Sequence, residues 1–503
     1  MLIKAFSKLV LFIGPFVIIW YMFVYFDGEQ YAEDWSEAHF THDKPVVQSL
    51  KEPELVVQYN VPPSEPEHIL DGPLPPSQDG NDLVDIPFVE ENREHIPPSS
   101  QDLIISPSEP NEANADEASY QEVFSVSTAD KKYFSISFGP DHSTMNPNII
   151  PHPYEDNTWI VVAQTVMHEA GNFEEVACNA VFQLDGSLAC STPPTALSVA
   201  PSHTGNCKGK LEVFALNLGP RDMRVFYGPD APYVVYGSQS AHTCFSLFAQ
   251  DFRSLHYKEY DLDAFNANLF ATGTELQRPP PGQAIEKNWY MFWDSQNAPY
   301  VHHDVFPKRV FAQLLPDGAV GPDLAPNAAL NDDACMARFM PKLGSEQESI
   351  HQATNALAVT LCARSDPACI PSDDNTFILT VFQHKKYRKF HATYEPYIML
   401  TQSVPPFAIH AISTKPIWIH GRGPLTRESS ARYREEGSVL PEGHTEMFYV
   451  TSINWREKGL KWRGYVDDVV IVGFGVEDER SAGMDFKVGD LLVDLGVCGD
   501  GGN

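Results

Sequence analysis

The chain has 503 residues, with 67 acidic and 35 basic side chains and a formal net charge of −32. No block of Lys and Arg is interleaved with aromatic residues, so the sequence lacks the phosphate-neutralising surface of nucleic-acid-binding proteins. The charge is uneven, because 24 acidic residues but only Lys44, Lys51 and Arg93 lie between Asp27 and Asp130.

The first predicted element is an apolar run from Leu9 to Phe26 that contains no charged residue. Its length is close to the ~20 residues that a membrane-spanning helix needs. Two lysines precede the run and Asp27 and Glu29 follow it, which predicts a cytosolic N-terminus and a lumenal remainder. A cleaved signal peptide is the alternative, but the run ends in bulky aromatic residues instead of small ones. We therefore expect a cytoplasmic tail at residues 1–8 and an uncleaved signal anchor at 9–26.

A short span suits the thinner membranes of the early secretory pathway, which predicts a single-pass type II protein of the Golgi membrane or the ER. Residues 27–130 are rich in Pro and acidic side chains and poor in apolar clusters. Such a segment buries too little surface to offset its ordering entropy, so we expect a disordered stem. The stem is either a self-repelling spacer or a charged binding segment.

All eight cysteines follow the stem. An even number in an oxidising lumen favours disulfides, although eight cysteines permit many pairings. Cys362 and Cys369, which flank a polar loop, are the first candidate pair. Zinc is the weaker alternative, because no Cys-x-x-Cys or His-x-x-x-His spacing occurs. The chain has no Asn-x-Ser/Thr acceptor, so N-glycosylation is not expected.

Residues 131–498 are expected to form an all-β lumenal domain, followed by a tail at 499–503. Short runs of β-branched and aromatic residues are typical of strands; they include Trp159–Gln164, Tyr233–Tyr236, Phe377–Phe382 and Val469–Phe474. A single short helix is predicted at Ser345–Ala356. Many short strands favour a sandwich, a barrel or a propeller.

One weakly repeated element favours the propeller. A turn with Pro or Asp precedes a hydrophobic strand that ends in a small or polar residue. It occurs in five segments, namely Asn146–Gln164, Asp222–Ser238, Asn288–Val301, Thr354–Gln383 and Gly443–Gly475. We expect a propeller whose long loops line a central funnel.

Several motifs resemble those of the five-bladed propellers shared by inverting mannoside phosphorylases, β-1,2-mannosyltransferases and, more distantly, furanoside-type glycoside hydrolases. The most specific is Glu286-Lys287-Asn288-Trp289, which looks like the Glu-Lys-Asn-Trp signature at the start of a blade. The others are Asn146–Ile150, Pro220–Phe226, Pro405–Ile409 with Lys415-Pro416, and Val469–Asp478. Together they span most of the domain. The resemblance implies a five-bladed β-propeller that handles sugars.

Two segments depart from this pattern. The family's Glu-Asp-Pro-Arg is Arg221-Asp222-Met223-Arg224 here, and its Gly-Gly-Ser/Thr-Pro turn appears as Gln352–Asn355. Both departures affect what the resemblance implies for acceptor binding.

Glycosyl transfer needs a carboxyl group that takes or gives a proton at the bridging oxygen. Asp222 is the candidate for this catalytic acid or base. Arg221 and Arg224 favour its charged form, or alternatively bind an anionic donor group such as a phosphate. The competing interpretation is a solvated turn with a local ion pair.

Further substrate-binding candidates follow from the resemblance. Lys287 and Asn288 supply a cation and an amide that orient a sugar, and Asn146 belongs to the first-blade motif. Trp289, Tyr290 and Trp293 form either an aromatic wall of the pocket or part of the core. His384 and His444 are either sugar ligands or hydrogen-bonded residues at strand edges.

Other patterns carry weaker expectations. Asp261 and Asp263 form an Asp-x-Asp that binds divalent metal in many transferases, but such a pattern is common in acidic chains. His302 and His303 are adjacent on a predicted strand and so point to opposite faces, against a shared metal. Glu477–Arg480 is a charged turn whose first two residues can reach the funnel from the last blade. We therefore expect no metal or cofactor.

The leading functional hypothesis is a glycosyltransferase that moves mannose from a sugar nucleotide such as GDP-mannose to a mannose-containing glycan. Glycan-building enzymes of the Golgi share the layout of anchor, stem and lumenal domain. The alternatives are a glycoside hydrolase or phosphorylase on the same fold and a non-catalytic, membrane-anchored lectin.

Overall fold

The computed structural model describes most of the chain from residue 120 onward. The described residues are 120–166, 174–200, 202, 204–216, 219–256, 259–260, 269–388, 391–434 and 438–498. Within these ranges no helix has the length and apolarity that crossing a membrane requires. The predicted anchor at 9–26, most of the predicted stem and the tail at 499–503 lie outside them and remain predictions.

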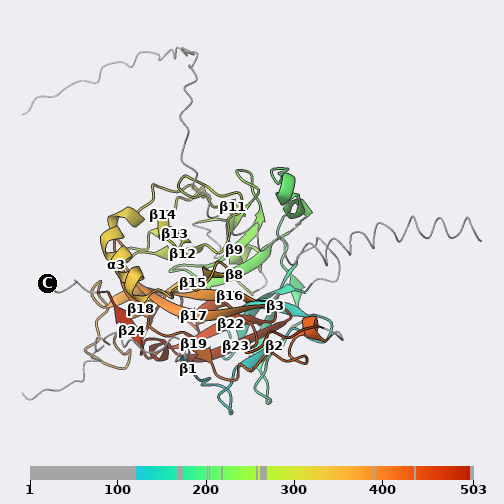
Figure 1. Cartoon of the computed structure of the whole chain (residues 1–503). Helices are drawn as coiled ribbons and strands as arrows, with labels where there is room; N and C mark the ends of the chain where they lie inside the picture. The colour runs from blue at the N-terminus through green and yellow to red at the C-terminus, as the bar shows by residue number, and fades with distance from the viewer. Residues whose placement is uncertain are drawn as a thin grey trace, which may run out of the picture. The chain divides into compact units, whose positions relative to one another are not determined.

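Antiparallel strands in several sheets dominate the described residues, so the all-β prediction is confirmed (Figure 1). One sheet contains β8 (Arg221–Tyr227), β9 (Pro232–Gln239), β10 (Phe245–Asp251) and β11 (Thr274–Glu275). The next contains β12 (Tyr290–Trp293), β13 (Pro299–Asp304) and β14 (Val310–Gln313). A third contains β15 (Glu348–Thr360), β16 (Thr376–Arg388), β17 (His391–Gln402) and β18 (Ile409–Ser413), with β21 (Arg463–Tyr465) and β24 (Leu495–Val497) at its edges.

A nine-stranded sheet joins the start of the folded region to its end. Its antiparallel halves are β3 (Thr144–Pro151), β4 (Trp159–Thr165), β5 (Glu175–Phe182) and β6 (Leu188–Cys190), and β20 (Phe448–Trp455), β22 (Val469–Val476), β23 (Arg480–Lys487) and β2 (Phe134–Ser137). A short parallel pairing of β2 with β6 connects the halves, and β7 (Thr195–Ala196) pairs with β5. The last pairing, of β1 (Gln121–Val123) with β19 (Ile417–Ile419), shows that folded structure begins before the predicted boundary at Lys131.

The first strands of these sheets lie against one another. β3 contacts β8 and β20, and β15 contacts β12, β8 and β20. Each of the five predicted repeat segments contributes a hairpin to this arrangement, namely β3–β4, β8–β9, β12–β13, β15–β16 and β20–β22. Such an arrangement is consistent with a propeller.

Buried amide side chains connect the first strands where no backbone ladder runs between them. Asn148 donates to the carbonyl of Met223 at 2.7 Å and accepts from the Val225 amide at 3.1 Å. Asn355 likewise donates to the carbonyl of Ile453 at 2.6 Å and accepts from the Ile453 amide at 3.1 Å. Because an amide side chain both donates and accepts, it satisfies the buried peptide groups of the neighbouring strand.

The predicted helix at Ser345–Ala356 is wrong. This segment forms most of β15, which pairs with β16 from Glu348 to Thr360 and with β21 at its far end. Pairing on both sides and burial of its second half outweigh the weak strand propensity of its Gln, Ala and Asn residues. The described α-helix is α3 (Ala329–Phe339), and short 3-10 turns include η1 (Gly209–Leu216), η2 (Phe252–Ser254), η5 (Ala325–Asn327), η6 (Ala431–Tyr433) and η7 (Val488–Leu491).

A buried ion pair attaches α3 to the sheets. Arg309 donates to Asp332 at 2.6 Å and to the carbonyl of Phe407 at 2.9 Å, while Asp332 also accepts from the Ile409 amide at 2.8 Å. Arg309→Leu leaves the Asp332 carboxylate buried without its cation, so we expect the free energy of unfolding to fall by about 3–5 kcal/mol. Urea titration measures the loss. The double variant Arg309→Leu/Asp332→Leu should recover part of it, and an unchanged single variant would contradict this role of the ion pair.

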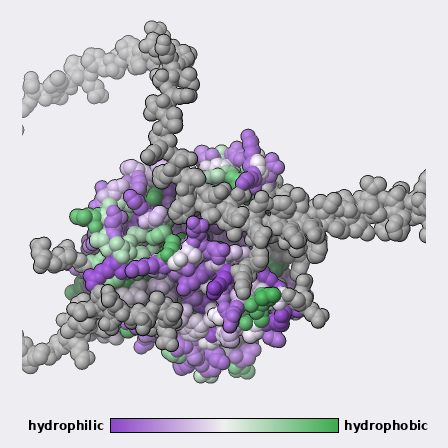
Figure 2. Space-filling view, in the orientation of Figure 1, coloured by the Kyte–Doolittle hydropathy of each residue, from purple (hydrophilic) through white to green (hydrophobic). Residues whose placement is uncertain are grey.

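All eight cysteines are paired, as Cys178–Cys190, Cys207–Cys244, Cys335–Cys498 and Cys362–Cys369. The predicted pairing of Cys362 with Cys369 is confirmed, and zinc ligation by cysteine is wrong because no thiol remains free. On the face shown in Figure 2, hydrophilic residues cover most of the described surface and hydrophobic ones form small patches.

Candidate active site

Three site residues lie at the beginnings of first strands in a left-handed backbone conformation. Asn146, Asp222 and Asn288 have φ angles of 55°, 50° and 63°. Asn and Asp tolerate this region better than other non-glycine residues. The pairing register shifts at Met145/Asn148 and at Arg221/Arg224, next to two of these positions. Such bulges turn a side chain out of the regular alternation of a strand.

Asp222 is exposed, while neighbouring strands hold its backbone. Its amide donates to the side-chain oxygen of Gln164 at 3.0 Å, and the next amide, of Met223, donates to Glu175 at 3.1 Å. Asn146 donates to the Asp222 carboxylate at 3.3 Å. A solvent-accessible carboxylate on a fixed backbone is suited to proton transfer with a bound substrate.

The pocket beside Asp222 is small, with a cavity volume of about 20 Å³, and has two unlike walls. The polar wall consists of Arg221, Asp222, Arg224, Lys287 and Asn288, and the apolar wall of Val235, Gly237, Phe245, Leu247 and Trp289. A few polar groups opposite an apolar wall are typical of small-molecule sites.

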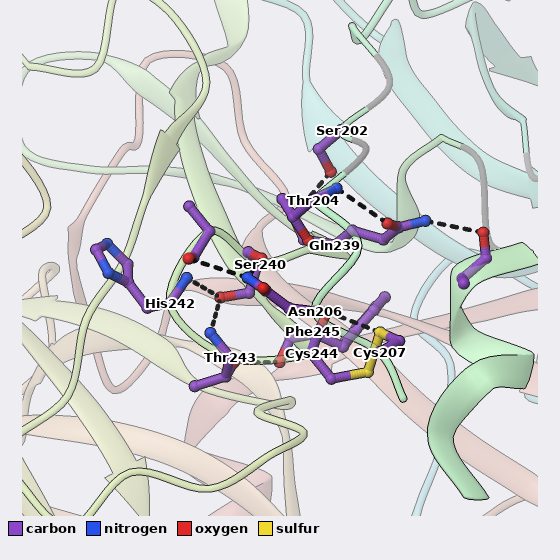
Figure 3. Close-up of a disulfide and its surroundings, with 12 residues drawn as sticks. Ser202, Thr204, Asn206, Cys207, Gln239, Ser240, His242, Thr243, Cys244 and Phe245 are labelled. Carbon is purple, nitrogen blue, oxygen red and sulfur yellow. Dashed lines mark hydrogen bonds between the residues drawn. A yellow bond between two sulfur atoms is a disulfide. The ribbon is translucent and has the colours of Figure 1, made fainter. Parts of the chain in front are cut away.

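The apolar wall depends on a glycine and a disulfide. A β-carbon on Gly237 would lie 2.5 Å from the Phe245 ring, so only glycine lets the ring pack against this strand. Cys244, the preceding residue, is bonded to Cys207 (Figure 3). The segment around Cys207 is also attached through Asn206, whose amide donates to the carbonyl of Ser240 at 3.0 Å. These contacts hold Phe245 at the pocket.

The polar wall is rich in positive charge. Desolvation and the nearby cations Lys385 and Arg221 lower the pKa of Lys287 to about 8, and Asp222 opposes the shift. Desolvation also lowers the pKa of Lys385, which Asp478 opposes. Lys287 nevertheless remains exposed, as expected for a group inside a concave site that opens to solvent. Cations gathered around one exposed carboxylate fit a substrate with an anionic group.

Two further carboxyl groups lie near Asp222. Desolvation and the negative charge of Asp222 raise the pKa of Asp478 to about 6. Burial raises the pKa of Glu175 to about 8, against the hydrogen bond from Met223. Glu175 is therefore mostly protonated at neutral pH, whereas Asp478, whose pKa lies below neutral, is mostly ionised. Asp478, from the predicted charged turn Glu477–Arg480, thus lies close enough to Asp222 for the two charges to interact.

Sequence reasoning missed Lys385 and two tyrosines. Tyr449 and Tyr394 both interact electrostatically with Asp222, and desolvation raises the pKa of Tyr449 to about 12 and that of Tyr394 well above its usual value. Both phenols therefore stay protonated and can donate to a bound ligand. The sequence contained a signal for Lys385, because it follows the predicted site residue His384 on a strand. Side chains alternate along a strand, so if His384 points away from the site, Lys385 points toward it.

The structure brings six of the eight predicted site residues together, namely Asn146, Arg221, Asp222, Arg224, Lys287 and Asn288. Arg224 is buried, and it donates to the carbonyls of Ala353 at 2.6 Å and of Asp222 at 2.9 Å, so it mainly supports the backbone. Trp289, Tyr290 and Trp293 are all buried in one core cluster, and Trp289 also lines the pocket.

The two predicted histidines lie apart from this cluster. His384 is 2.8 Å from the Glu348 carboxylate, and His444 lines a separate hollow and contacts His391 at 2.8 Å. The structure therefore does not join them to the pocket at Asp222, and their roles in binding remain predictions.

The metal patterns find no support in the described part of the chain, which holds no group of three or more His, Cys, Asp or Glu arranged for a metal ion. Nδ1 of His302 lies 2.8 Å from the side-chain oxygen of Gln352. The ring of His303 packs edge-on against Trp289, with 4.4 Å between the ring centroids. The two histidine side chains thus have different partners, as expected for neighbours that point to opposite faces of a strand. The Asp-x-Asp at 261–263 lies outside the described residues.

No family model and no curated protein matches the chain. Among solved structures it is similar to β-1,2-mannobiose phosphorylase from Listeria innocua, with 11% identity and a TM-score of 0.35 over 74% of this chain and 96% of that one. It is also similar to MPT-1, a GDP-Man-dependent mannosyltransferase from Leishmania mexicana, with 10% identity and a TM-score of 0.35 over 70% and 89%. A third similar structure is the catalytic domain of the Coprinopsis cinerea GH62 α-L-arabinofuranosidase, with 11% identity and a TM-score of 0.35 over 70% and 96%.

Proposed function

We propose that the chain is a glycosyltransferase that moves a mannosyl group from a sugar nucleotide, GDP-mannose, to a mannose-containing glycan. The observation that carries this proposal is the exposed Asp222 carboxylate in a pocket that Arg221, Lys287 and nearby Lys385 make positive. A sugar nucleotide has an anionic diphosphate next to its reacting carbon. The pocket offers complementary charge for that diphosphate and a base for the acceptor.

In the proposed reaction, Asp222 accepts the proton of an acceptor hydroxyl as its oxygen bonds to the anomeric carbon. The bond from that carbon to the diphosphate breaks, and the electron pair leaves with the diphosphate. Arg221, Lys287 and Lys385 stabilise the charge that develops there. Asn146 orients the Asp222 carboxylate through its 3.3 Å hydrogen bond. The chemistry needs no cofactor.

We further propose that the sheets form five blades, one for each first strand among β3, β8, β12, β15 and β20. The five repeat segments and the blade-start motif Glu286–Trp289 support this count. The predicted anchor at 9–26 and stem would hold the domain at the Golgi membrane, on the lumenal side. The four disulfides suit that oxidising compartment.

The second candidate function is a glycoside hydrolase or phosphorylase, and Asp478 is the observation that favours it. An inverting hydrolase needs a carboxylic acid and a carboxylate on opposite sides of the bond. Asp478, with its pKa raised to about 6, is suited to the acid role beside the carboxylate of Asp222.

The test is an incubation of the full-length chain with GDP-mannose and mannose oligosaccharides. We expect a product one hexose longer than the acceptor and the release of GDP, detected by mass spectrometry and chromatography. Release of mannose from the oligosaccharide without any nucleotide, dependent on Asp478, would instead establish the hydrolase. Phosphate-dependent release of mannose 1-phosphate would establish the phosphorylase. Glycan binding with no turnover of any donor would identify a lectin.

A further inference from the structure

The enclosed pocket beside Asp222 has room for only one small group of atoms. Its cavity volume is about 20 Å³, and a single water molecule already needs about 10–15 Å³. Sites that enclose a small molecule commonly have volumes of about 300–1,000 Å³, so a whole sugar nucleotide does not fit inside. If the proposed donor reaches Asp222 with its sugar, the rest of it therefore lies on the surface that adjoins the pocket.

Three partly exposed residues form a row on one face of β16 and β17. Lys385 and Tyr387 are two residues apart on β16, so their side chains project from the same face. Tyr394 of β17 pairs directly with Lys385 and therefore shares that face. Nζ of Lys385 lies 5.6 Å from the centre of the Tyr394 ring and 5.7 Å from the centre of the Tyr387 ring. Tyr394, Lys385 and Tyr387 are named the tyrosine–lysine row below.

The row begins at the active site and leads away from it. Tyr394, at the inner end, interacts electrostatically with Asp222. Lys385, in the middle, acts on the charge of Lys287 in the polar wall of the pocket. Tyr387 lies two residues further along β16, a distance of about 7 Å, toward the end of that strand. A ligand that extends from Asp222 along this face therefore meets the two lysines first and Tyr387 afterwards.

The charge around the outer part of the row is positive. Burial raises the pKa of Tyr387, but the nearby cation Arg432 acts to lower it. Burial also lowers the pKa of Lys385, and the carboxyl group of Asp478 at the inner end opposes this shift. Lys386, the residue after Lys385, is exposed on the opposite face of β16 and does not belong to the row.

A cation between two aromatic rings suits an anionic ligand that also carries a flat ring. Phosphate oxygens accept hydrogen bonds from an ammonium group, and a nucleobase stacks on an aromatic side chain. An uncharged oligosaccharide would pack against the tyrosine rings but would leave the charge of Lys385 without a partner. The row therefore favours a nucleotide over a glycan.

We propose that the tyrosine–lysine row binds the nucleoside diphosphate part of the donor. With the mannosyl group at Asp222, the diphosphate lies at Lys287 and Lys385. The base stacks on the ring of Tyr387. The order of the groups in the ligand, which is sugar, diphosphate and nucleoside, then matches the order of carboxylate, lysines and tyrosine in the protein. The proposal rests on the glycosyltransferase function and names where its donor lies.

The test measures how the full-length chain binds GDP and mannose 1-phosphate, by isothermal titration calorimetry without an acceptor. Tyr387→Ala should weaken the binding of GDP about tenfold, because the base loses its aromatic partner. The same variant should keep its affinity for mannose 1-phosphate, which has no base. Lys385→Gln should weaken the binding of both probes about tenfold, since it removes a cation from the phosphate.

Two variants serve as matched controls. Tyr387→Phe keeps the aromatic ring and should bind GDP as the unmutated chain does. Lys386→Gln removes an exposed cation from the other face of the same strand and should keep both affinities. Equal loss of GDP and mannose 1-phosphate binding in Tyr387→Ala, or a loss of GDP binding in Tyr387→Phe as large as in Tyr387→Ala, would contradict stacking of the base on this ring.

An assay of mannosyl transfer separates this proposal from the proposed function. Transfer with an unchanged KM for GDP-mannose in both Tyr387→Ala and Lys385→Gln would overturn the row as the donor site and leave the transferase intact. GDP binding that depends on Tyr387 in a chain without transfer activity would support the row and overturn the transferase. Mannotriose binding that depends on Tyr387, in a chain that does not bind millimolar GDP, would overturn the assignment of the row to a nucleotide.

Discussion

Asp222→Asn is expected to lower the rate of mannosyl transfer by about 10²–10⁴-fold, the usual contribution of a general base. The amide keeps the shape of the carboxylate and its place beside Asn146, but it cannot accept a proton from the acceptor. The affinity for GDP-mannose should change much less, because Arg221 and Lys287 remain. Steady-state kinetics with each substrate varied in turn separates kcat from KM.

The matched control is Asp185→Asn. Asp185 is an exposed carboxylate in the turn between β5 and β6, at the opposite end of β5 from Glu175. This variant should transfer mannose at the unmutated rate. Near-normal activity of Asp222→Asn would remove Asp222 from the mechanism and direct the search for the base to Asp478.

Glu175→Gln is expected to change how stability depends on pH. Burial raises the pKa of Glu175 from 4.5 to about 8, so between these values the folded chain holds a proton that the unfolded chain releases. The free energy of unfolding therefore falls as pH rises from 4.5 to 8, by up to about 1.4 kcal/mol per pH unit from this group. The contribution is fully present below pH 4.5 and lost above pH 8.

The measurement is a urea titration of both proteins across this pH range. Glutamine cannot ionise, so the stability of Glu175→Gln relative to the unmutated chain should rise with pH and level off above pH 8. Groups common to both proteins, Asp478 among them, cancel in the difference. Parallel stability curves would show that Glu175 does not titrate within the range.

Local patterns in the sequence predicted much of the fold. The β-branched and aromatic runs at Trp159–Gln164 and Phe377–Phe382 lie within β4 and β16, because such side chains favour a half-buried pleated surface. The repeat segments matched hairpins because each unit carries its own turn and strand. The segment at Ser345–Ala356 failed, since its strand pairing is decided by β16 and β21 rather than by its own residues.

For the candidate site, too, some residues could be predicted from local sequence and others only from the folded chain. Sequence motifs were enough to name Asp222, Lys287 and Asn288, because their residue types and short spacings are local properties. Other features appear only in the folded chain, where distant strands meet. They are the nearness of Lys385 and Glu175 to the pocket, and the contacts of His391 with Glu477 and with His444. Burial and neighbouring charge, which set the pKa of a carboxyl or an amine, depend on the whole packing around it.

The sequence by itself thus determined the all-β class, the pairing of Cys362 with Cys369 and the residue types of the candidate site. Tertiary structure alone decided which of those residues share a pocket. His384 and Lys385 are neighbours in the chain, yet Lys385 interacts with the site while His384 contacts Glu348. The physical reason is the alternation of side chains along a strand, which leaves the choice of face to the packing of the sheets.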